Sequence, residues 1–475
     1  MNKSTEKYKN LILNTLILGL GVFGSKLLVF FMMPLYTGIL SPAEYSTADL
    51  LSQTANLLMP LACVGITDGV FRFTMDKEAD KRSVFSSGLA VLLAAGIIFA
   101  VMSPLIDLVD YFNGYGWLIA LYVLAANTHS LCAQYVRAQN KTLLFAVRGI
   151  INTLLVIILN VVFLVVFDMG ILGYVLSVAV ADLVVVVMLF VVGKLYNDVR
   201  PSFIDLQTIK KMLRYSVPMI PATIFWWITA VSDRYMVTYF AGETANGLYS
   251  AAYKIPTVLT LVSSVFMEAW QYSAVSESDL GGTASSETVK FFGGVFSHYQ
   301  SIMLLAASVI IGMSQIFITI LCADSYFDAW RFIPVLTIAS IFSGFTSFIG
   351  SVYLVKKKSM LTFLTAMSGA VVNVVLNLML IPSMGAQGAA VATAVSYFAV
   401  FVIRAFNARK YVPFSLSLPM MIAGVGVLVA QSIATLIFDA YFWLIQIVSI
   451  SLVAVINLRP LVKGTLVMLK KRRKN

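Results

Sequence analysis

Charged residues are scarce in this 475-residue sequence: aspartate, glutamate, lysine and arginine together make up 12% of it. Hydrophobic residues make up 60%, and the mean hydropathy is +0.90. A soluble globular domain has about 25% charged and about 45 to 50% apolar residues. The composition therefore excludes an ordinary soluble protein and predicts an integral membrane protein that crosses the bilayer many times.

Cysteine and histidine are also rare, and their positions exclude several kinds of site. The cysteines Cys63, Cys132 and Cys322 are isolated and lie in or beside apolar runs, which indicates no disulfide framework. The histidines His129 and His298 have no partners at a zinc-ligand spacing, so we expect no metal site. The sequence has no glycine-rich phosphate loop and no soluble segment long enough for a nucleotide-binding domain. We therefore expect no cofactor and no ATP-driven transport by this chain alone.

Apolar runs recur from one end of the chain to the other. A helix needs about 20 apolar residues to cross the hydrocarbon core of a bilayer. Fourteen runs of this kind are predicted to cross, at residues 11–36, 44–72, 83–107, 115–138, 142–167, 170–195, 212–240, 245–272, 288–320, 329–354, 359–381, 385–407, 412–437 and 440–466. The predicted fold class is an all-α integral membrane protein with fourteen transmembrane helices.

The net charge of +11 comes from basic residues that fall between alternate predicted helices. The basic connections are the N-terminal tail, residues 72–82, 137–141, 194–214, 356–358 and 404–410, and the final KKRRK. The other connections contain almost no lysine or arginine, and cytoplasmic loops carry an excess of both. We therefore expect both termini in the cytoplasm, contact of the basic tail with anionic membrane lipid, and no nucleic-acid partner.

The chain contains an internal repeat. Residues 35–51 resemble residues 239–255 at an offset of 204, and residues 168–182 resemble residues 383–397 at an offset of 215. Six predicted helices separate the members of each pair, so the two repeats have the same orientation in the membrane. We expect a six-helix lobe at 1–200, a second at 201–410 that starts with a cytoplasmic linker, and an added helix pair with a basic tail at 411–475. Two parallel lobes around a central cleft are typical of alternating-access transporters.

Charged residues within predicted helices indicate the functional region, because a charge near the bilayer centre costs at least about 2.5 to 3.5 kcal/mol on insertion scales. The first lobe has Lys26 and Asp49, and the second has Asp233, Arg234 and Lys254. One interpretation is structural, with Asp233–Lys254 and Lys26–Asp49 bridges between neighbouring helices. The other is that Lys26, Lys254 and Arg234 line the cleft and bind an anionic substrate, with the acids as their partners.

Five further charged residues have less defined surroundings. Asp68 and Arg72 are one helical turn apart, which favours an i,i+4 pair at the cytoplasmic rim, and Arg72 is also a substrate-binding candidate. Arg148 either extends to the inner membrane surface or faces the cleft and its substrate. Glu268 and Asp182 are candidates for the carboxylate of a coupling ion, H+ or Na+, and the alternative for each is a hydrogen-bonded contact between helices.

The segment SDRYMVTYFAGETANGLYSAAYKIP at residues 232–256 carries a family resemblance, together with the element MGxxGxxxxxxV, which occurs twice. With the helix count, it resembles the polysaccharide-biosynthesis flippases of the multidrug/oligosaccharidyl-lipid/polysaccharide exporter superfamily. The resemblance implies a transporter, not an enzyme, in the bacterial inner membrane. Its substrate would be a polyprenyl-pyrophosphate-linked oligosaccharide repeat unit, of the O-antigen or capsule type, moved to the outer face by alternating access. Polysaccharide assembly proteins would be its partners.

Related lipid flippases place cations on helices 1, 2 and 8 of the cleft to bind the pyrophosphate. Lys26 and Lys254 match helices 1 and 8, whereas helix 2 has the acid Asp49 in its outer half and Arg72 only near its inner end. Two alternatives remain. A cation-coupled multidrug antiporter of the same superfamily would favour acidic cleft residues, and a membrane-embedded sugar polymerase would need a catalytic constellation, usually on a sizeable outer loop.

Overall fold

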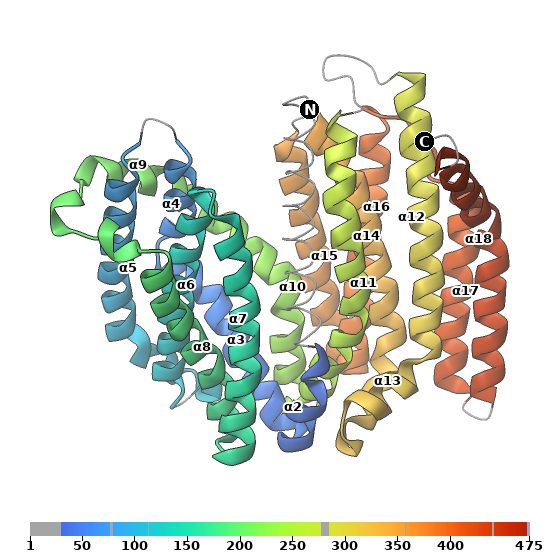
Figure 1. Ribbon diagram of the computed structural model, residues 1–475. Coiled ribbons are helices and arrows are strands. Elements are labelled where there is room, and N and C mark those ends of the chain that lie inside the picture. Colours follow the sequence, from blue (N-terminus) through green and yellow to red (C-terminus); the bar gives the residue numbers. More distant parts are fainter. Residues whose placement is uncertain are drawn as a thin grey trace. The chain divides into compact units, whose positions relative to one another are not determined.

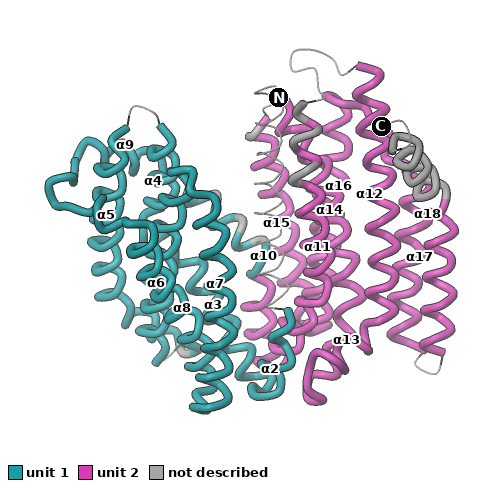
Figure 2. The backbone as a smooth tube through the Cα atoms, in the orientation of Figure 1, with its two compact units in different colours: residues 1–231 teal, residues 232–475 magenta. Residues whose placement is uncertain are grey.

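The computed structural model describes residues 30–76, 79–112, 114–276, 285–356, 358–438 and 441–472. Every regular element among these residues is helical, and this part of the chain contains no strand (Figure 1). The chain forms two compact units, residues 1–231 and residues 232–475, which Figure 2 shows in two colours. Each unit packs its helices around a core of its own.

The described part of the first unit consists of α2 (Met33–Ile39), α3 (Pro42–Ala62), α4 (Ile66–Thr74), α5 (Lys81–Met102), α6 (Gly116–Ala138), α7 (Thr142–Asn160), α8 (Gly170–Val192), α9 (Leu206–Ser216) and the start of α10 (Ile220–Ala241). Helix α6 is the central helix, because it packs against α3, α4, α5 and α8. Small buried residues such as Ala125 and Ala133 allow this close packing. Phe85 of α5 stacks on Tyr135 of α6 with the ring centroids 4.2 Å apart.

The predicted span at residues 44–72 is broken in the structure. Helix α3 begins with a capping box between Ser41 and Glu44 and ends at Ala62, and α4 starts at Ile66 after a bend of 59°. Gly65 at the bend has φ +65°, a left-handed conformation that glycine adopts without a steric penalty. A Cβ at Gly65 would lie 3.2 Å from the Ser216 carbonyl oxygen, so the bend also allows α4 to lie close to the end of α9.

The predicted linker folds as two short 3-10 turns, Leu195–Asp198 and Pro201–Phe203, followed by α9. At 1.5 Å per residue, α9 is roughly 16 Å long, too short to cross a hydrocarbon core of about 30 Å. Its buried residue Met212 joins the core of the first unit, where α9 packs against α4 and α5. The units are defined by packing and the lobes by the repeat, so the lobe boundary at residue 200 stays a prediction.

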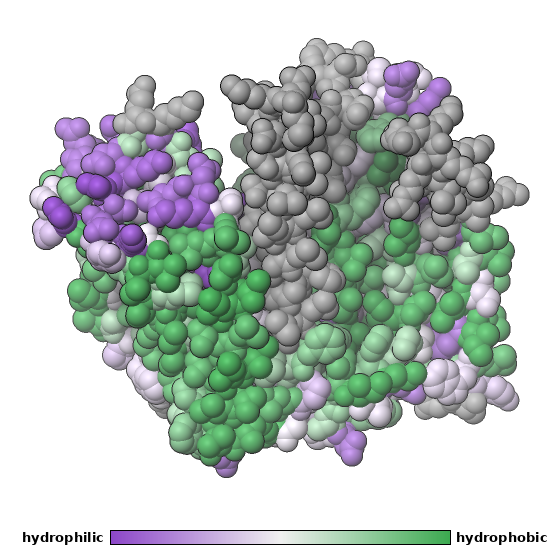
Figure 3. Space-filling model, viewed as in Figure 1, coloured by the Kyte–Doolittle hydropathy of each residue, from purple (hydrophilic) through white to green (hydrophobic). Residues whose placement is uncertain are grey.

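Three of the predicted basic connections meet at one end of the first unit. Lys141 Nζ donates to the Gly193 carbonyl at 3.1 Å, and Arg82 Nε lies 3.4 Å from Asp198 Oδ1. Tyr135 donates its hydroxyl proton to the same carboxylate at 3.0 Å. Figure 3 shows hydrophilic residues gathered over α9 and the segment before it, while apolar residues cover the helices of this unit further from that end. This separation supports a common side for the three connections.

The described part of the second unit consists of the end of α10 and of α11 (Glu243–Ser276), α12 (Ser286–Gly312), α13 (Ser314–Leu321), α14 (Ile333–Val355), α15 (Ser359–Met384), α16 (Ala386–Ala408), α17 (Leu418–Ile437) and α18 (Phe442–Arg472). Helix α14 is central and packs against α11, α12 and α16. Its core is aromatic: Phe348 stacks on Trp270 of α11 at a centroid distance of 4.6 Å and contacts Phe296 of α12 at 5.1 Å.

A buried amide network joins α17 and α18, the predicted added pair, to α12. Gln431 Nε2 of α17 donates to the Ser308 carbonyl of α12 at 3.0 Å and to Gln446 Oε1 of α18 at 2.7 Å. Gln446 Nε2 donates to Thr435 Oγ1 at 2.8 Å. Buried polar groups in apolar surroundings need such partners. The network therefore connects the added pair to the second unit through polar as well as apolar contacts.

Ten helices in the described part of the chain are long and apolar enough to cross a membrane, and the bent pair α3 and α4 makes an eleventh if it is one span. Helices α10 and α18 coincide with two more predicted spans, at 212–240 and 440–466. The predicted span at 11–36 lies mostly outside the described residues. The all-helical multi-pass fold is thus confirmed, whereas the count of fourteen and the two lobes around a cleft stay predictions.

Candidate functional site

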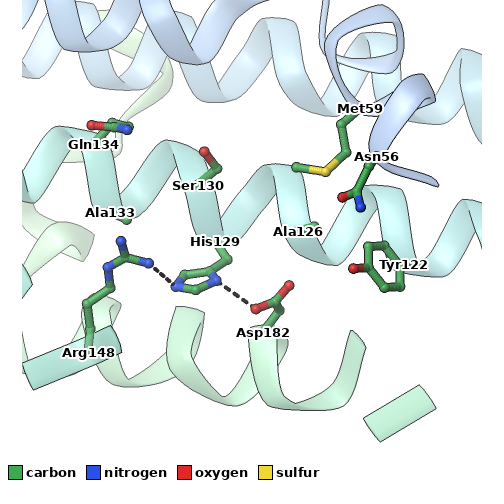
Figure 4. Close-up of a pocket in the computed structure, with 10 residues that line it drawn as sticks. All are labelled: Asn56, Met59, Tyr122, Ala126, His129, Ser130, Ala133, Gln134, Arg148 and Asp182. Atoms are coloured by element: carbon green, nitrogen blue, oxygen red, sulfur yellow. Dashed lines mark hydrogen bonds and ion pairs between the residues drawn. The ribbon is translucent and has the colours of Figure 1, made fainter. Parts of the chain in front are cut away.

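Three polar side chains connect three neighbouring helices of the first unit (Figure 4). His129 of α6 lies between Arg148 of α7 and Asp182 of α8. The distance from Arg148 Nη1 to His129 Nε2 is 2.7 Å, and the distance from His129 Nδ1 to Asp182 Oδ1 is also 2.7 Å. His129 and Asp182 are buried, and the half-buried Arg148 guanidinium lies 4.4 Å from the centroid of the Phe145 ring. A cation, an imidazole and an acid are therefore held together within apolar helices.

The donor and acceptor roles in this network follow from the chemistry of arginine. A guanidinium has only N–H donors, so His129 Nε2 must accept from Arg148. In this arrangement the ring proton lies on Nδ1, which donates to Asp182. A second proton on Nε2 would place two donors 2.7 Å apart. Protonation of His129 must therefore break its contact with Arg148.

The network forms part of the wall of a cavity of about 230 Å³. In Figure 4, Asn56 and Tyr122 lie on the Asp182 side of this cavity, and Gln134 lies on the Arg148 side. Arg148 Nε and Gln134 Oε1 are buried and make no hydrogen bond within the described part of the chain. Buried polar atoms are normally satisfied by protein or ordered water. The cavity therefore offers open polar positions to water or to a ligand.

The structure brings together two residues that the sequence proposed separately, Arg148 and Asp182. The residue that bridges them, His129, has no role in the sequence prediction, which considers it only as a metal ligand and rejects that role. It is 19 positions from Arg148 and 53 positions from Asp182, so no local motif connects the three. The one available signal is that each is a polar residue in an apolar span, where a partner on another helix is expected. Among the described residues, no cluster of three or more potential ligands could hold a metal ion.

In the second unit, Asp233 of α10 is buried and bound by neighbours from α11 and α16. The Tyr249 hydroxyl donates to Oδ2 at 2.6 Å, and the Thr393 hydroxyl lies 3.4 Å from the same oxygen. The backbone N–H of Arg234 donates to Oδ1 at 2.9 Å. Tyr249 therefore connects α10 to α11 at this carboxylate, and the proposed Asp233–Lys254 bridge stays a prediction.

The other predicted cleft residues that the structure describes lie on α3, α10 and α11. Arg234 is buried on α10 with its guanidinium over an aromatic ring, Lys254 is half-buried on α11, and Asp49 is buried on α3. Lys26 and the side chain of Glu268 lie outside the described residues, and so does the proposed Lys26–Asp49 bridge. The substrate-binding and coupling roles of these five residues stay predictions.

Asp68 and Arg72 are both exposed on α4. The described residues contain no ion pair between them, so the expected i,i+4 pair is not formed in this structure. An exposed ion pair of this kind contributes only about 0.3 to 0.5 kcal/mol to stability. Hydration of the two separate charges stabilises them about equally well.

A protein-family model described as "Polysaccharide biosynthesis protein" matches residues 11–271. No curated protein matches the sequence. Among solved structures, the fold is similar to that of the lipid II flippase MurJ in an inward closed conformation, with a TM-score of 0.71 and 14% identity. That match covers 95% of this chain and 100% of the other.

The fold is also similar to that of a multidrug resistance MATE family transporter of the MOP superfamily in an inward-facing conformation. The TM-score is 0.65 and the identity 12%, over 84% of this chain and 98% of the other. A MOP superfamily transporter from Pyrococcus furiosus matches with a TM-score of 0.57 and 11% identity, over 84% of this chain and 95% of the other. At these identities the similarity concerns the fold.

Proposed function

The chain belongs to the polysaccharide biosynthesis protein family, whose model matches more than half of its 475 residues, and from this premise we propose that it is a lipid-linked oligosaccharide flippase. It moves polyprenyl-pyrophosphate-linked repeat units, of the O-antigen or capsule type, from the cytoplasmic to the outer face of the bacterial inner membrane. Transport occurs by alternating access: the head group enters an inward-open cleft while the lipid tail stays in the bilayer. The chain catalyses no covalent step.

The observation that carries this proposal is the Arg148–His129–Asp182 network beside a cavity. Ionisable side chains within membrane-spanning helices are rare, and they typically mark substrate or ion pathways. A membrane protein with a purely structural role has little use for a cation and an acid at a cavity with open polar atoms. The network thus supports transport, and the family supports polysaccharide intermediates as the substrate class.

The pyrophosphate requires positive charge, and we assign this role to Lys26 and Lys254, with Arg234, Arg148 and Arg72 as further candidates. An ammonium group in surroundings of low dielectric constant attracts an anion much more strongly than it does in water. The half-buried position of Lys254 within the apolar helix α11 supports its assignment. We assign the pairing of these cations before substrate arrives to Asp49 and Asp233.

We assign the coupling of transport to a proton that binds His129. Histidine is the side chain that ordinarily changes charge near neutral pH. The groups that contact its ring are Arg148 from α7 and Asp182 from α8, and Tyr122 of α6 lines the same cavity. Protonation releases Arg148 from His129 and frees a guanidinium in the cavity. Glu268 is the alternative carboxylate for a coupling ion, H+ or Na+.

A cation-coupled multidrug antiporter is the second candidate, and the fold similarity to MATE transporters favours it. Such a protein would export organic cations, for which the acids Asp49, Asp182 and Asp233 would be the main binding groups. A flippase requires the lysines in place of the acids. The two candidates therefore differ in which charge is essential.

The test is transfer of a radiolabelled polyprenyl-pyrophosphate oligosaccharide across liposomes that contain the purified protein, read out by a membrane-impermeant glycosidase added outside. The flippase should raise the accessible fraction above that of protein-free liposomes. The Lys26→Ala, Lys254→Ala double variant should abolish this transfer, and the matched arginine variants should retain part of it. Transfer at the protein-free rate, together with proton-driven efflux of a cationic dye, would assign the chain to the antiporters.

A further inference from the structure

The second unit contains a cavity of its own, of about 290 Å³, between α11 and α14. Its described polar lining consists of Thr260, Ser263, Ser264 and Gln271 of α11 and Ser343 and Ser347 of α14. All of these side chains are uncharged, and five of the six carry a hydroxyl group. This lining differs from that of the cavity in the first unit, which has a cation, an acid and an imidazole.

The hydroxyl groups present acceptors to the cavity. Thr260, Ser264 and Ser347 each donate to a backbone carbonyl of their own helix, at 2.7, 2.8 and 3.0 Å respectively. A hydroxyl has one proton and two lone pairs. Because the proton of each is used within its helix, only lone pairs remain for a ligand. A wall of this kind is complementary to a molecule with many O–H or N–H donors.

Two further contacts keep this wall in place. Ser263 is hydrogen-bonded to the Tyr299 hydroxyl, and the Tyr299 ring stacks on Phe266 with the centroids 4.6 Å apart. A Cβ at Gly344 would lie 2.5 Å from the Tyr299 hydroxyl oxygen and 3.3 Å from Ser263 Oγ, so a larger residue would displace both. Gln271 is exposed at the cavity, and within the described part of the chain its amide has no hydrogen-bond partner. It adds two donors and an acceptor.

The repeat relates this cavity to the one in the first unit. At the offset of 204 residues, Asn56 corresponds to Thr260, and both line their cavities. By the second match of the repeat, α6 and α8, which contain His129 and Asp182, correspond to α14 and α16 of the second unit. Helix α6 contributes His129 to the first cavity, whereas the corresponding helix α14 contributes Ser343 and Ser347 to the second. The two cavities are therefore suited to different ligand chemistry.

We propose that the cavity between α11 and α14 binds one uncharged sugar residue of the oligosaccharide head group. This inference rests on the proposed function, because it assigns the sugars to a named place in the second unit. Ligand cavities typically have volumes of about 300 to 1,000 Å³, and this one is at the lower end, so it accommodates a single ring. Hydroxyl groups of the ring donate to the serine and threonine oxygens, and Met267 contacts its C–H groups.

The test uses the full-length protein in nanodiscs without maltoside or other sugar detergents, whose head groups would compete. Saturation-transfer difference NMR measures binding of glucose, galactose and N-acetylglucosamine in sodium chloride and in choline chloride. The variants are Ser264→Ala and Ser347→Ala, with Ser340→Ala as the matched control. Ser340 lies on the same helix as Ser347, donates to its own helix at 3.0 Å, and does not line the cavity. Each cavity variant should weaken binding roughly fivefold, the effect of one lost hydrogen bond, and the control should leave it unchanged.

The inference is overturned if no monosaccharide binds, or if Ser264→Ala and Ser347→Ala both bind the monosaccharides like the unmodified protein in both salts. Head-group transfer in liposomes, measured in parallel, separates this inference from the proposed function. Transfer without monosaccharide binding removes the sugar site and retains the flippase. Monosaccharide binding that depends on Ser264 and Ser347, without any transfer, retains the sugar site and removes the flippase.

Discussion

Gly350 of α14 lies directly against the guanidinium of Arg404 of α16: a Cβ added to this glycine would be 2.6 Å from Arg404 Nη1. The guanidinium is buried and bound by neutral oxygens, with Nε 2.9 Å from Thr365 Oγ1, Nη1 3.0 Å from the Thr346 carbonyl and Nη2 3.4 Å from the Thr362 carbonyl. Arg404 thus joins α14, α15 and α16, and glycine at 350 makes room for it.

We predict that Gly350→Ala destabilises the second unit by about 1 to 3 kcal/mol, because overpacking displaces a guanidinium held by three hydrogen bonds. Gly426→Ala in α17 is the matched control, since a Cβ there has no neighbour within 4 Å and alanine favours a helix. Thermal unfolding in detergent measures both. In an Arg404→Leu background, Gly350→Ala should reduce the stability only slightly. An equal loss of stability in both backgrounds would exclude the contact with Arg404 as the cause.

Substitution of His129 by glutamine should remove the dependence of transport on a proton gradient. Glutamine keeps a donor and an acceptor for Asp182 and Arg148, but it does not bind a proton near neutral pH. Transfer by this variant should be the same with and without the gradient, whereas the unmodified protein should be faster with it. The control is His298→Gln on α12, a helix of the second unit. Retention of the gradient effect in His129→Gln would assign coupling to another group.

The amide network of α12, α17 and α18 should be cooperative. Gln431→Leu leaves the Ser308 carbonyl and the Gln446 amide without their buried partner, at a cost of about 1 kcal/mol or more. Gln431→Leu with Gln446→Leu removes two members of the network together, so the double variant should lose less than the sum of the single variants. The free energies of unfolding in SDS are compared for the unmodified protein, the two single variants and the double variant. Strict additivity would contradict a shared network. Ser432→Ala, whose hydroxyl donates only within α17, is the control.

Removal of the Tyr249 hydroxyl should destabilise the second unit by about 1 to 3 kcal/mol, because it removes a hydrogen bond from a buried carboxylate. Tyr249→Phe keeps the ring and isolates this effect. The matched control is Tyr253→Phe, which retains the ring beneath Arg234 and should change little. In an Asp233→Asn background, Tyr249→Phe should destabilise the protein less, because a neutral amide gains less from the phenol hydrogen bond than a carboxylate does. An unchanged cost in that background would mean that Tyr249 stabilises by packing alone.

Hydropathy predicts the long helices well, because lipid exposure depends on the total apolar content of a segment. The predicted spans at 142–167 and 385–407 agree within about a turn with the observed helices Thr142–Asn160 with its π-helical extension and Ala386–Ala408. The break at Gly65 escapes this kind of prediction, because it depends on one left-handed residue and on space beside Ser216. The average hydropathy of a segment contains information on neither the backbone conformation of one residue nor the space beside it.

The polar partners were less predictable than the helices. Sequence reasoning places Arg404 at the start of a basic cytoplasmic connection, yet the structure buries it among carbonyl and hydroxyl oxygens of α14 and α15. The partner of Asp182 is a histidine on α6, and that of Asp233 is a tyrosine on α11. Such pairs depend on helix rotation and packing, which a single sequence contains only indirectly. The charged residues themselves were identifiable, because charge within an apolar span is expensive.

The final prediction concerns α9, whose N-terminus is capped by the exposed residue Asp205. Its carboxylate accepts from the Thr208 hydroxyl at 2.6 Å, from the Thr208 N–H at 2.8 Å and from the Gln207 N–H at 3.2 Å. These hydrogen bonds, those from Thr208 first, hold the pKa of Asp205 below its usual range, because they favour the ionised form. Because the pKa of Asp205 is lower in the folded than in the unfolded chain, its ionised form stabilises the fold at pH values above the pKa of the unfolded chain. This stabilisation is lost as the pH falls through the pKa that Asp205 has in the folded chain.

Helix α9 should therefore loosen on the acidic side of about pH 4, where aspartate ordinarily begins to take up protons. Hydrogen exchange of residues 206–216, corrected for intrinsic rates, should show this loss in the unmodified protein. Asp205→Ala should exchange faster at every pH, whereas Asp205→Asn should keep a cap that no longer depends on pH. If Asp205→Ala and the unmodified protein exchange at the same rate near neutral pH, packing of Met212 alone maintains α9.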